Sequence, residues 1–191
     1  METSRIEELK ISYEELKKDN QRIQKKGLPF MMASVIIWSL IFGIQFLNID
    51  VIHRNLLAFT SSVFLLPLAY AFSKLVKADI FIKSRNPINK LGFLFTMNQM
   101  LYLLIVMWAY SCNPNAMVML YAMVFGAHLL PFGMIYDSRA YFVTSITETI
   151  GAMIINLIWG STFTALFMII MQIIISTLLF TDIRKADRVE S

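Results

Sequence analysis

Apolar residues fill this chain in six long stretches, and polar residues gather in the gaps between them. Each stretch holds about 20 residues, the length that a helix needs to cross a hydrocarbon core at roughly 1.5 Å per residue. A helix also satisfies its own backbone hydrogen bonds, as the bilayer interior requires. We therefore expect an all-α, polytopic membrane protein with six transmembrane helices, at residues 28–48, 55–76, 91–110, 115–136, 140–160 and 161–181.

Composition agrees with this fold class, because 57% of the residues are hydrophobic and only 16% are charged. Such a chain has too little polar surface to cover a soluble domain of its size. A polar segment, residues 1–27, precedes the first stretch without a small-x-small cleavage pattern, so we expect the first helix to remain as an anchor. Residues 182–191 follow the last stretch as a cytoplasmic tail. Cys112 is the single cysteine, which excludes a disulfide within the chain.

The basic residues predict how the helices are oriented. If the N-terminus is cytoplasmic, sixteen of the 17 Lys and Arg residues lie in cytoplasmic segments, and only Arg54 lies outside. This asymmetry follows the positive-inside rule, so we expect both termini in the cytoplasm. Contact with membrane lipid accounts for the net charge of +4, and we expect no nucleic-acid partner.

Before the first stretch, a seam of residues recurs at alternating spacings of three and four, which predicts an amphipathic cytoplasmic helix. The seam consists of Ile6, Leu9, Tyr13, Leu16, Asn20 and Ile23. Asn20 stands at a position where a buried polar residue sets the register of short coiled coils. Two interpretations remain open. Residues 4–26 bind a second copy or another protein, or they pack on the protein's own cytoplasmic face.

Five strongly polar residues fall at one depth in the predicted membrane helices. Counted from the cytoplasmic ends, each lies about seven to nine residues in, or roughly 10 to 14 Å below the inner boundary. They are Asn98, Gln99, His128, Glu148 and Gln172. An ionised carboxylate in hydrocarbon costs several kcal/mol, so we expect Glu148 to face the interior of the bundle. Equal depth alone does not show that the five side chains meet.

This polar layer supports two hypotheses about function. In the first, the protein is a small transporter or permeation protein, in which Glu148 and His128 carry a proton or bind a cation. The amides of Asn98, Gln99 and Gln172 then act as neutral ligands. In the second, the layer only links neighbouring helices, and the protein is a scaffold or partner subunit that acts through its N-terminal helix. Water access to the layer would separate the two hypotheses.

Enzyme motifs are missing, so we expect no enzymatic activity, no catalytic residue, no metal site and no cofactor. The chain has no His-Glu-x-x-His pattern, and the predicted topology places His53 and His128 on opposite sides of the membrane midplane. Ser161 follows Gly160 in a turn, without a nearby histidine to act as its base.

Two parts of the chain carry a resemblance to a family of small membrane proteins. The first part is Asn89-Lys90-Leu91-Gly92-Phe93, and the second runs from Gly126 to Gly133 and continues as Ile135-Tyr136-Asp137-Ser138. Over most of its length the chain resembles a family of small bacterial six-helix membrane proteins of unknown function. The resemblance implies the cytoplasmic membrane of a bacterium and a helix count, but it implies no activity and no residue roles.

Overall fold

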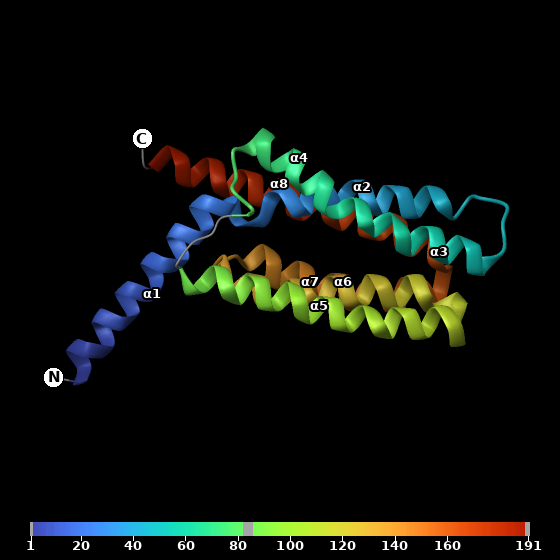
Figure 1. Ribbon diagram of the computed structural model, residues 1–191, viewed down its shortest axis with the longest axis horizontal. Helices are drawn as coiled ribbons and strands as arrows, with labels where there is room; N and C mark the ends of the chain where they lie inside the picture. The colour runs from blue at the N-terminus through green and yellow to red at the C-terminus, as the bar shows by residue number, and fades with distance from the viewer. Residues whose placement is uncertain (1, 82–85, 190–191) are drawn as a thin grey trace.

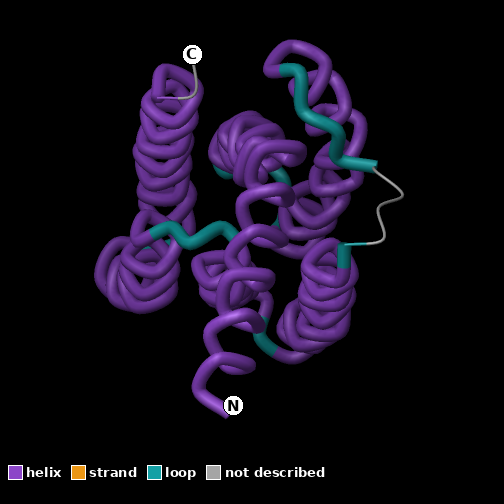
Figure 2. Tube along the Cα trace, turned by 90° about the vertical axis from the view of Figure 1, so that its left-hand side faces the viewer, coloured by secondary structure: helices purple, strands orange, loops and turns teal. Residues whose placement is uncertain are grey.

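The computed structural model describes residues 2–81 and 86–189, which form helices and connecting turns without a strand (Figures 1 and 2). Six helical segments in this part of the chain are long and apolar enough to cross a membrane. The expected all-α architecture with six membrane-length apolar segments is therefore confirmed for this part of the chain, as a multi-pass membrane protein requires. In chain order the elements are α1 (Glu2–Gln24), η1 (Lys25–Gly27), α2 (Leu28–Ile44), α3 (Val51–Ser61), η2 (Ser62–Phe64), α4 (Leu65–Val76), α5 (Pro87–Cys112), η3 (Pro114–Ala116), α6 (Met117–Ile135), α7 (Arg139–Trp159) and α8 (Ser161–Val189).

Helix ends follow local sequence signals. Asn86 caps α5 by accepting a hydrogen bond from the Ile88 amide at 2.9 Å, and Pro87 occupies the first turn. Gly160 is the single residue between α7 and α8 and has a φ of 81°, a conformation that favours glycine. The last two helices therefore form a tight hairpin.

The second predicted span consists of two helices rather than one. A turn of 3-10 helix, η2, separates α3 from α4 and ends three residues before Pro67. Proline lacks an amide proton and clashes with the carbonyl group four residues earlier, which here belongs to Val63 within η2. Pro131, by contrast, lies inside the continuous helix α6.

The helices form two layers (Figure 1). One layer contains α2, α3, α4 and α8, and the other contains α5, α6 and α7. α2 packs mainly on α8 and α4, α6 packs on α7 and α5, and α7 joins the layers through α8. Large buried side chains fill the core, among them Trp38 of α2, Leu129 of α6 and Met168 of α8.

The N-terminal helix α1 leaves the bundle at an angle, at the end where both chain termini lie (Figure 1). Among the seam residues, Tyr13 and Leu16 pack against the core, and Asn20 is only 1% exposed. The side chains of Ile6 and Leu9 lie outside the described part of the structure. The described end of the seam thus packs on the protein itself, which is one of the two interpretations that the sequence leaves open.

Hydrogen bonds fix the end of α1 on the bundle. Asn86 donates from Nδ2 to the carbonyl oxygen of Leu16 at 2.8 Å. The Tyr141 hydroxyl group donates to the carbonyl oxygen of Lys26 at 2.7 Å, just after the helix ends. Ile23, the last residue of the seam, is half-buried at this junction. The end of α1 is therefore held by residues of α7 and of the turn that starts α5.

Candidate functional site

Glu148 lies in the middle of the buried face of α7, and its side chain is 0% exposed. Thr144, Ser145 and Ala152, which stand three or four residues away, are buried on the same face. These side chains are small, so neighbouring helices can approach the carboxyl group closely. Glu148 therefore faces the interior of the bundle.

Gln172 of α8 contacts Glu148 directly. Its Nε2 donates a hydrogen bond to Glu148 Oε1 at 2.6 Å, and the Gln172 side chain is also 0% exposed. The two residues are 24 positions apart with Gly160 midway between them, so the hairpin brings them to one height. The second carboxyl oxygen, Oε2, is buried and has no hydrogen-bond partner among the residues that the structure describes.

Ser34 of α2 is the third polar side chain at this point. Its hydroxyl oxygen lies 2.6 Å from Gln172 Oε1 and 2.7 Å from the carbonyl oxygen of Met31, so one proton has two acceptors. Gln172 thus turns its carbonyl oxygen toward Ser34 and its amide nitrogen toward Glu148. We name Ser34, Glu148 and Gln172 the polar cluster, which connects α2, α7 and α8.

Gly126 of α6 closes the fourth side of the polar cluster. A Cβ atom at this position would lie 2.8 Å from Glu148 Cβ and 2.9 Å from the amide nitrogen of Thr149. Both distances are well below van der Waals contact, so a side chain larger than that of glycine would push α6 away from α7. The absence of a side chain at Gly126 brings the α6 backbone against the carboxyl-bearing face of α7.

Two of the predicted site residues lie on α5 and do not join the polar cluster. Asn98 is exposed on the outside of the bundle, and Gln99 is half-buried. The depth of these two amides agrees with the other layer residues, but their helix packs on α6 rather than on α7 or α8. Among the described residues, no hydrogen bond joins either side chain to Glu148.

His128 of α6 is half-buried and has partners other than Glu148. Its Nδ1 donates to the carbonyl oxygen of Phe125 in its own helix. The imidazole ring packs edge-on against the rings of Phe125 and Phe132, with centroids 5.0 and 5.9 Å apart. Among the described residues, Glu148 and His128 therefore have different hydrogen-bond partners, Gln172 and Phe125, and do not bond each other.

A protein family described as a family of unknown function, DUF7010, matches residues 13–182. The chain belongs to this family. The resemblance to a family of unknown function is thus confirmed, while the bacterial source stays a prediction. No curated protein and no solved structure matches the chain. Because the function of the DUF7010 family is unknown, membership assigns no role to any residue.

The sequence-based prediction of the site in this DUF7010 protein omits Ser34. Serine in a membrane helix commonly bonds its own backbone, as Ser34 also does with Met31. Depth could have identified Ser34, because it stands six positions after Leu28, where α2 begins, and so lies close to the level of the predicted polar layer. Gly126 is missed for a different reason. Glycine has no functional group in its side chain, and its role here depends on the α7 atoms that pack against it.

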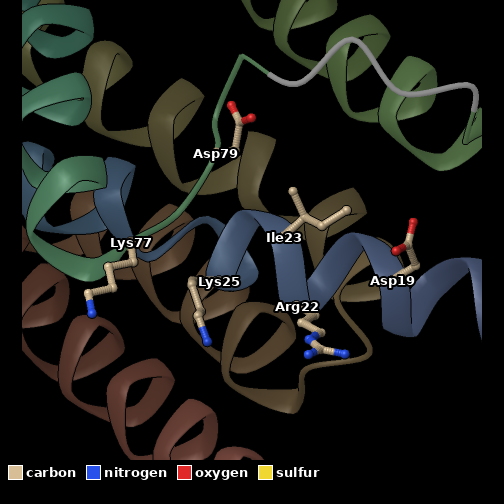
Figure 3. A pocket seen from close by; sticks show the side chains of 6 residues that line it. All are labelled: Asp19, Arg22, Ile23, Lys25, Lys77 and Asp79. Carbon is tan, nitrogen blue, oxygen red and sulfur yellow. The ribbon is translucent and has the colours of Figure 1, made fainter.

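A second feature of this DUF7010 protein is a groove of about 540 Å³ where α1 meets the segment after α4 (Figure 3). It is lined by Asp19, Arg22, Ile23, Lys25, Lys77 and Asp79. The three basic side chains point to one side, whereas the two carboxylates point to the other. Mixed charge at the end of the bundle fits contact with water and lipid head groups, and it singles out no ligand.

Proposed function

We propose that the protein is a small multi-pass permeation protein in which Glu148 takes up a proton or binds a cation within the membrane. The observation that carries the proposal is the buried Oε2 atom of Glu148, which has no partner among the described residues. Buried polar atoms are nearly always hydrogen-bonded, and an orphaned one calls for an explanation. Acidic side chains inside the membrane commonly mark a path for ions or protons.

The partners of Glu148 fit this role because they are neutral. Gln172 holds Oε1 by a hydrogen bond of 2.6 Å, and Ser34 in turn orients the Gln172 amide. Neither side chain brings a positive charge, so the polar cluster contains no ion pair that would neutralise an ionised carboxylate. A proton or a monovalent cation at Oε2 would supply that charge.

The residues around Glu148 differ from the set that the sequence suggested. Ser34 joins Gln172 as a neutral ligand, whereas Asn98 and Gln99 stay on α5. The proposal does not use His128, because its Nδ1 bonds the carbonyl oxygen of Phe125 and no hydrogen bond among the described residues joins its ring to Glu148.

The scaffold hypothesis has less support. Its binding surface is the seam of α1, yet Tyr13 and Leu16 pack against the core and Asn20 is buried. That packing covers the described part of the seam. The alternative is that the polar cluster only links α2, α7 and α8 and has no role in permeation. An experiment must separate this alternative from the proposal.

Ion flux into proteoliposomes tests the proposal. With a pH-sensitive dye enclosed and a potassium diffusion potential applied, we expect protons to enter faster than in protein-free vesicles. Glu148→Gln keeps the shape of the side chain and the contact with Gln172 but removes the titratable group, so the flux should fall to the protein-free level. Thr147→Val changes an exposed neighbour on the same helix and serves as the matched control, with unchanged flux.

Two outcomes would contradict the proposal. One is a wild-type protein that conducts H⁺, Na⁺ and K⁺ no faster than empty vesicles, and the other is unchanged flux with Glu148→Gln. A readout that does not depend on the ion is thiol labelling of Glu148→Cys in a Cys112→Ser background, with a small membrane-impermeant reagent. Labelling would show that water reaches the site. Protection of this cysteine, while one placed at Asn48 reacts, would indicate a dry structural tie.

A further inference from the structure

α5 is the most exposed of the membrane-length helices. In its most hydrophobic window only 6% of the residues are buried, against 50% in the windows of the segments that contain α2 and α6. Its inner side packs on α6 and includes the buried residues Ile88, Val106 and Ala109. α5 also contacts α1, α3 and η3, but its outer side is exposed at the edge of the bundle that is visible in Figure 1.

The outer side of α5 carries a second seam with the spacing of a coiled coil. Its residues are spaced alternately by three and four positions, and every one of them is exposed. We name it the α5 seam, and it consists of Leu91, Leu94, Asn98, Leu101, Ile105, Trp108 and Cys112. A repeat of 3.5 residues keeps one stripe facing a partner helix over several turns. A neighbouring row with the same spacing is also exposed, so the spacing alone does not select one stripe; it consists of Lys90, Phe93, Met97, Met100, Leu104, Met107 and Ser111.

Asn98 sets the α5 seam apart from an ordinary lipid-facing surface. It lies near the middle of α5, the part of the helix that stands deepest in the bilayer, and its side chain is exposed. Its amide forms no hydrogen bond with any residue in the ranges 2–81 and 86–189. An amide left unpaired in hydrocarbon is unfavourable, and asparagine side chains commonly bond across membrane helices instead.

We propose that the α5 seam is the contact surface for a second copy of this chain, with the two Asn98 amides hydrogen-bonded to each other. An amide has both a donor and an acceptor, so the same residue on two chains is self-complementary. Two copies inserted in the same orientation present α5 in parallel, and a two-fold axis then places each seam residue opposite its own counterpart. A parallel pair with a polar residue at a core position is the arrangement that such a seam favours.

The dimer does not depend on the proposed permeation role. The α5 seam faces away from the bundle, while the polar cluster lies between α2, α7 and α8. A dimer could thus form around two separate clusters, and loss of the dimer need not abolish flux.

Disulfide cross-linking tests this arrangement directly. Cys112 is exposed at the end of the α5 seam and is the only cysteine in the chain. A Cys112→Ser background allows two further single cysteines, Leu101→Cys on the seam and Met100→Cys beside it. Positions 100 and 101 have nearly equal depth and both side chains are exposed, at 47% and 64%, so they form a matched pair. We expect an oxidant to link Leu101→Cys into dimers in proteoliposomes at least several times faster than Met100→Cys.

The role of the amide is tested by the dimer dissociation constant. Asn98→Leu should weaken the dimer roughly 3- to 30-fold, the range expected for loss of one hydrogen bond between membrane helices. Asn98→Gln keeps an amide and should retain more of the affinity. Circular dichroism and gel filtration of each variant establish that the monomer is folded, so a weaker dimer cannot be attributed to unfolding.

Three results would overturn the proposal. Equal cross-linking at positions 100 and 101 would mean random collision, and no cross-linking at either would mean a lipid-facing helix. Cross-linking in cell membranes to a product that is not twice the mass of the chain would mean that a different protein covers the α5 seam.

Discussion

Gly126 determines how closely α6 approaches α7. Where its Cβ atom would stand, Glu148 Cβ and the backbone nitrogen of Thr149 lie within 2.8 to 2.9 Å. Backbone atoms cannot turn aside as a flexible side chain can, so a methyl group here separates two helices and disturbs the polar cluster. Gly43 is the opposite case, because nothing lies within 4 Å of its Cβ position.

We expect Gly126→Ala to lower the free energy of unfolding by about 1 to 3 kcal/mol, the usual cost of inserting a methyl group into a well-packed contact. Gly43→Ala is the matched control and should leave stability unchanged or raise it slightly, because alanine favours the helix. Thermal unfolding of both variants in one detergent measures the difference. A Gly126→Ala protein that melts with the wild type would contradict the packing argument.

At the scale of residues, depth along a helix can be read from the sequence but direction around the helix is harder to read. Equal depth brings Glu148 and Gln172 to one height, where the structure joins them by a hydrogen bond. Asn98 has a similar depth, yet it stands on the outer side of α5. The sequence could not identify Ser34 as a site residue. A serine that bonds only its own helix and one that also bonds a neighbouring helix cannot be distinguished in a sequence.

At the scale of elements, Asn86 has two structural roles. Its Oδ1 caps α5 through the Ile88 amide, while its Nδ2 donates to the Leu16 carbonyl oxygen at 2.8 Å and to Asp19 Oδ2 at 3.2 Å. The Asn86 side chain therefore joins the start of α5 to two residues of the N-terminal helix.

Asn86→Asp separates these two roles. The carboxylate still caps α5 but has no proton for Leu16, and it repels Asp19, so α1 should open from the bundle more often while α5 stays intact. Because each lost hydrogen bond is worth about 1 kcal/mol, we expect trypsin to cleave after Lys17 and Lys18 at least about fivefold faster. The same chemical change at the exposed Asn113 is the control and should leave the cleavage rate as it is. Equal rates for both variants would mean that the Asn86 hydrogen bonds do not limit the opening of α1.

Hydropathy predicts which segments are apolar enough to cross the membrane better than it predicts where each helix ends. The sixth predicted span stops at residue 181, whereas α8 continues to Val189, because Arg184, Lys185 and Ala186 are good helix formers outside the bilayer. Within the second span, apolar character is continuous through η2, so only Pro67 indicates the break between α3 and α4.

At the scale of the whole molecule, both chain ends lie at one end of the bundle, as six crossings require (Figure 1). We expect this end to be cytoplasmic because sixteen of the 17 basic residues lie on that side of the predicted topology. Fusions to alkaline phosphatase, which is active only outside the cytoplasm, measure the orientation in bacterial cells. Fusion after Ser191 should be inactive and fusion after Asn48 active, and the reverse pattern would contradict the prediction.

Gly160 also shapes how the last two helices enter the bilayer. With one residue between them, α7 and α8 are joined too tightly to insert far apart, so we expect them to enter as a hairpin. Within that hairpin the Gln172 amide already meets the Glu148 carboxyl group, so each polar group shields the other from lipid. We therefore expect the most costly side chain of the membrane domain to find its first partner during biogenesis, before α2 brings Ser34 to the assembled bundle.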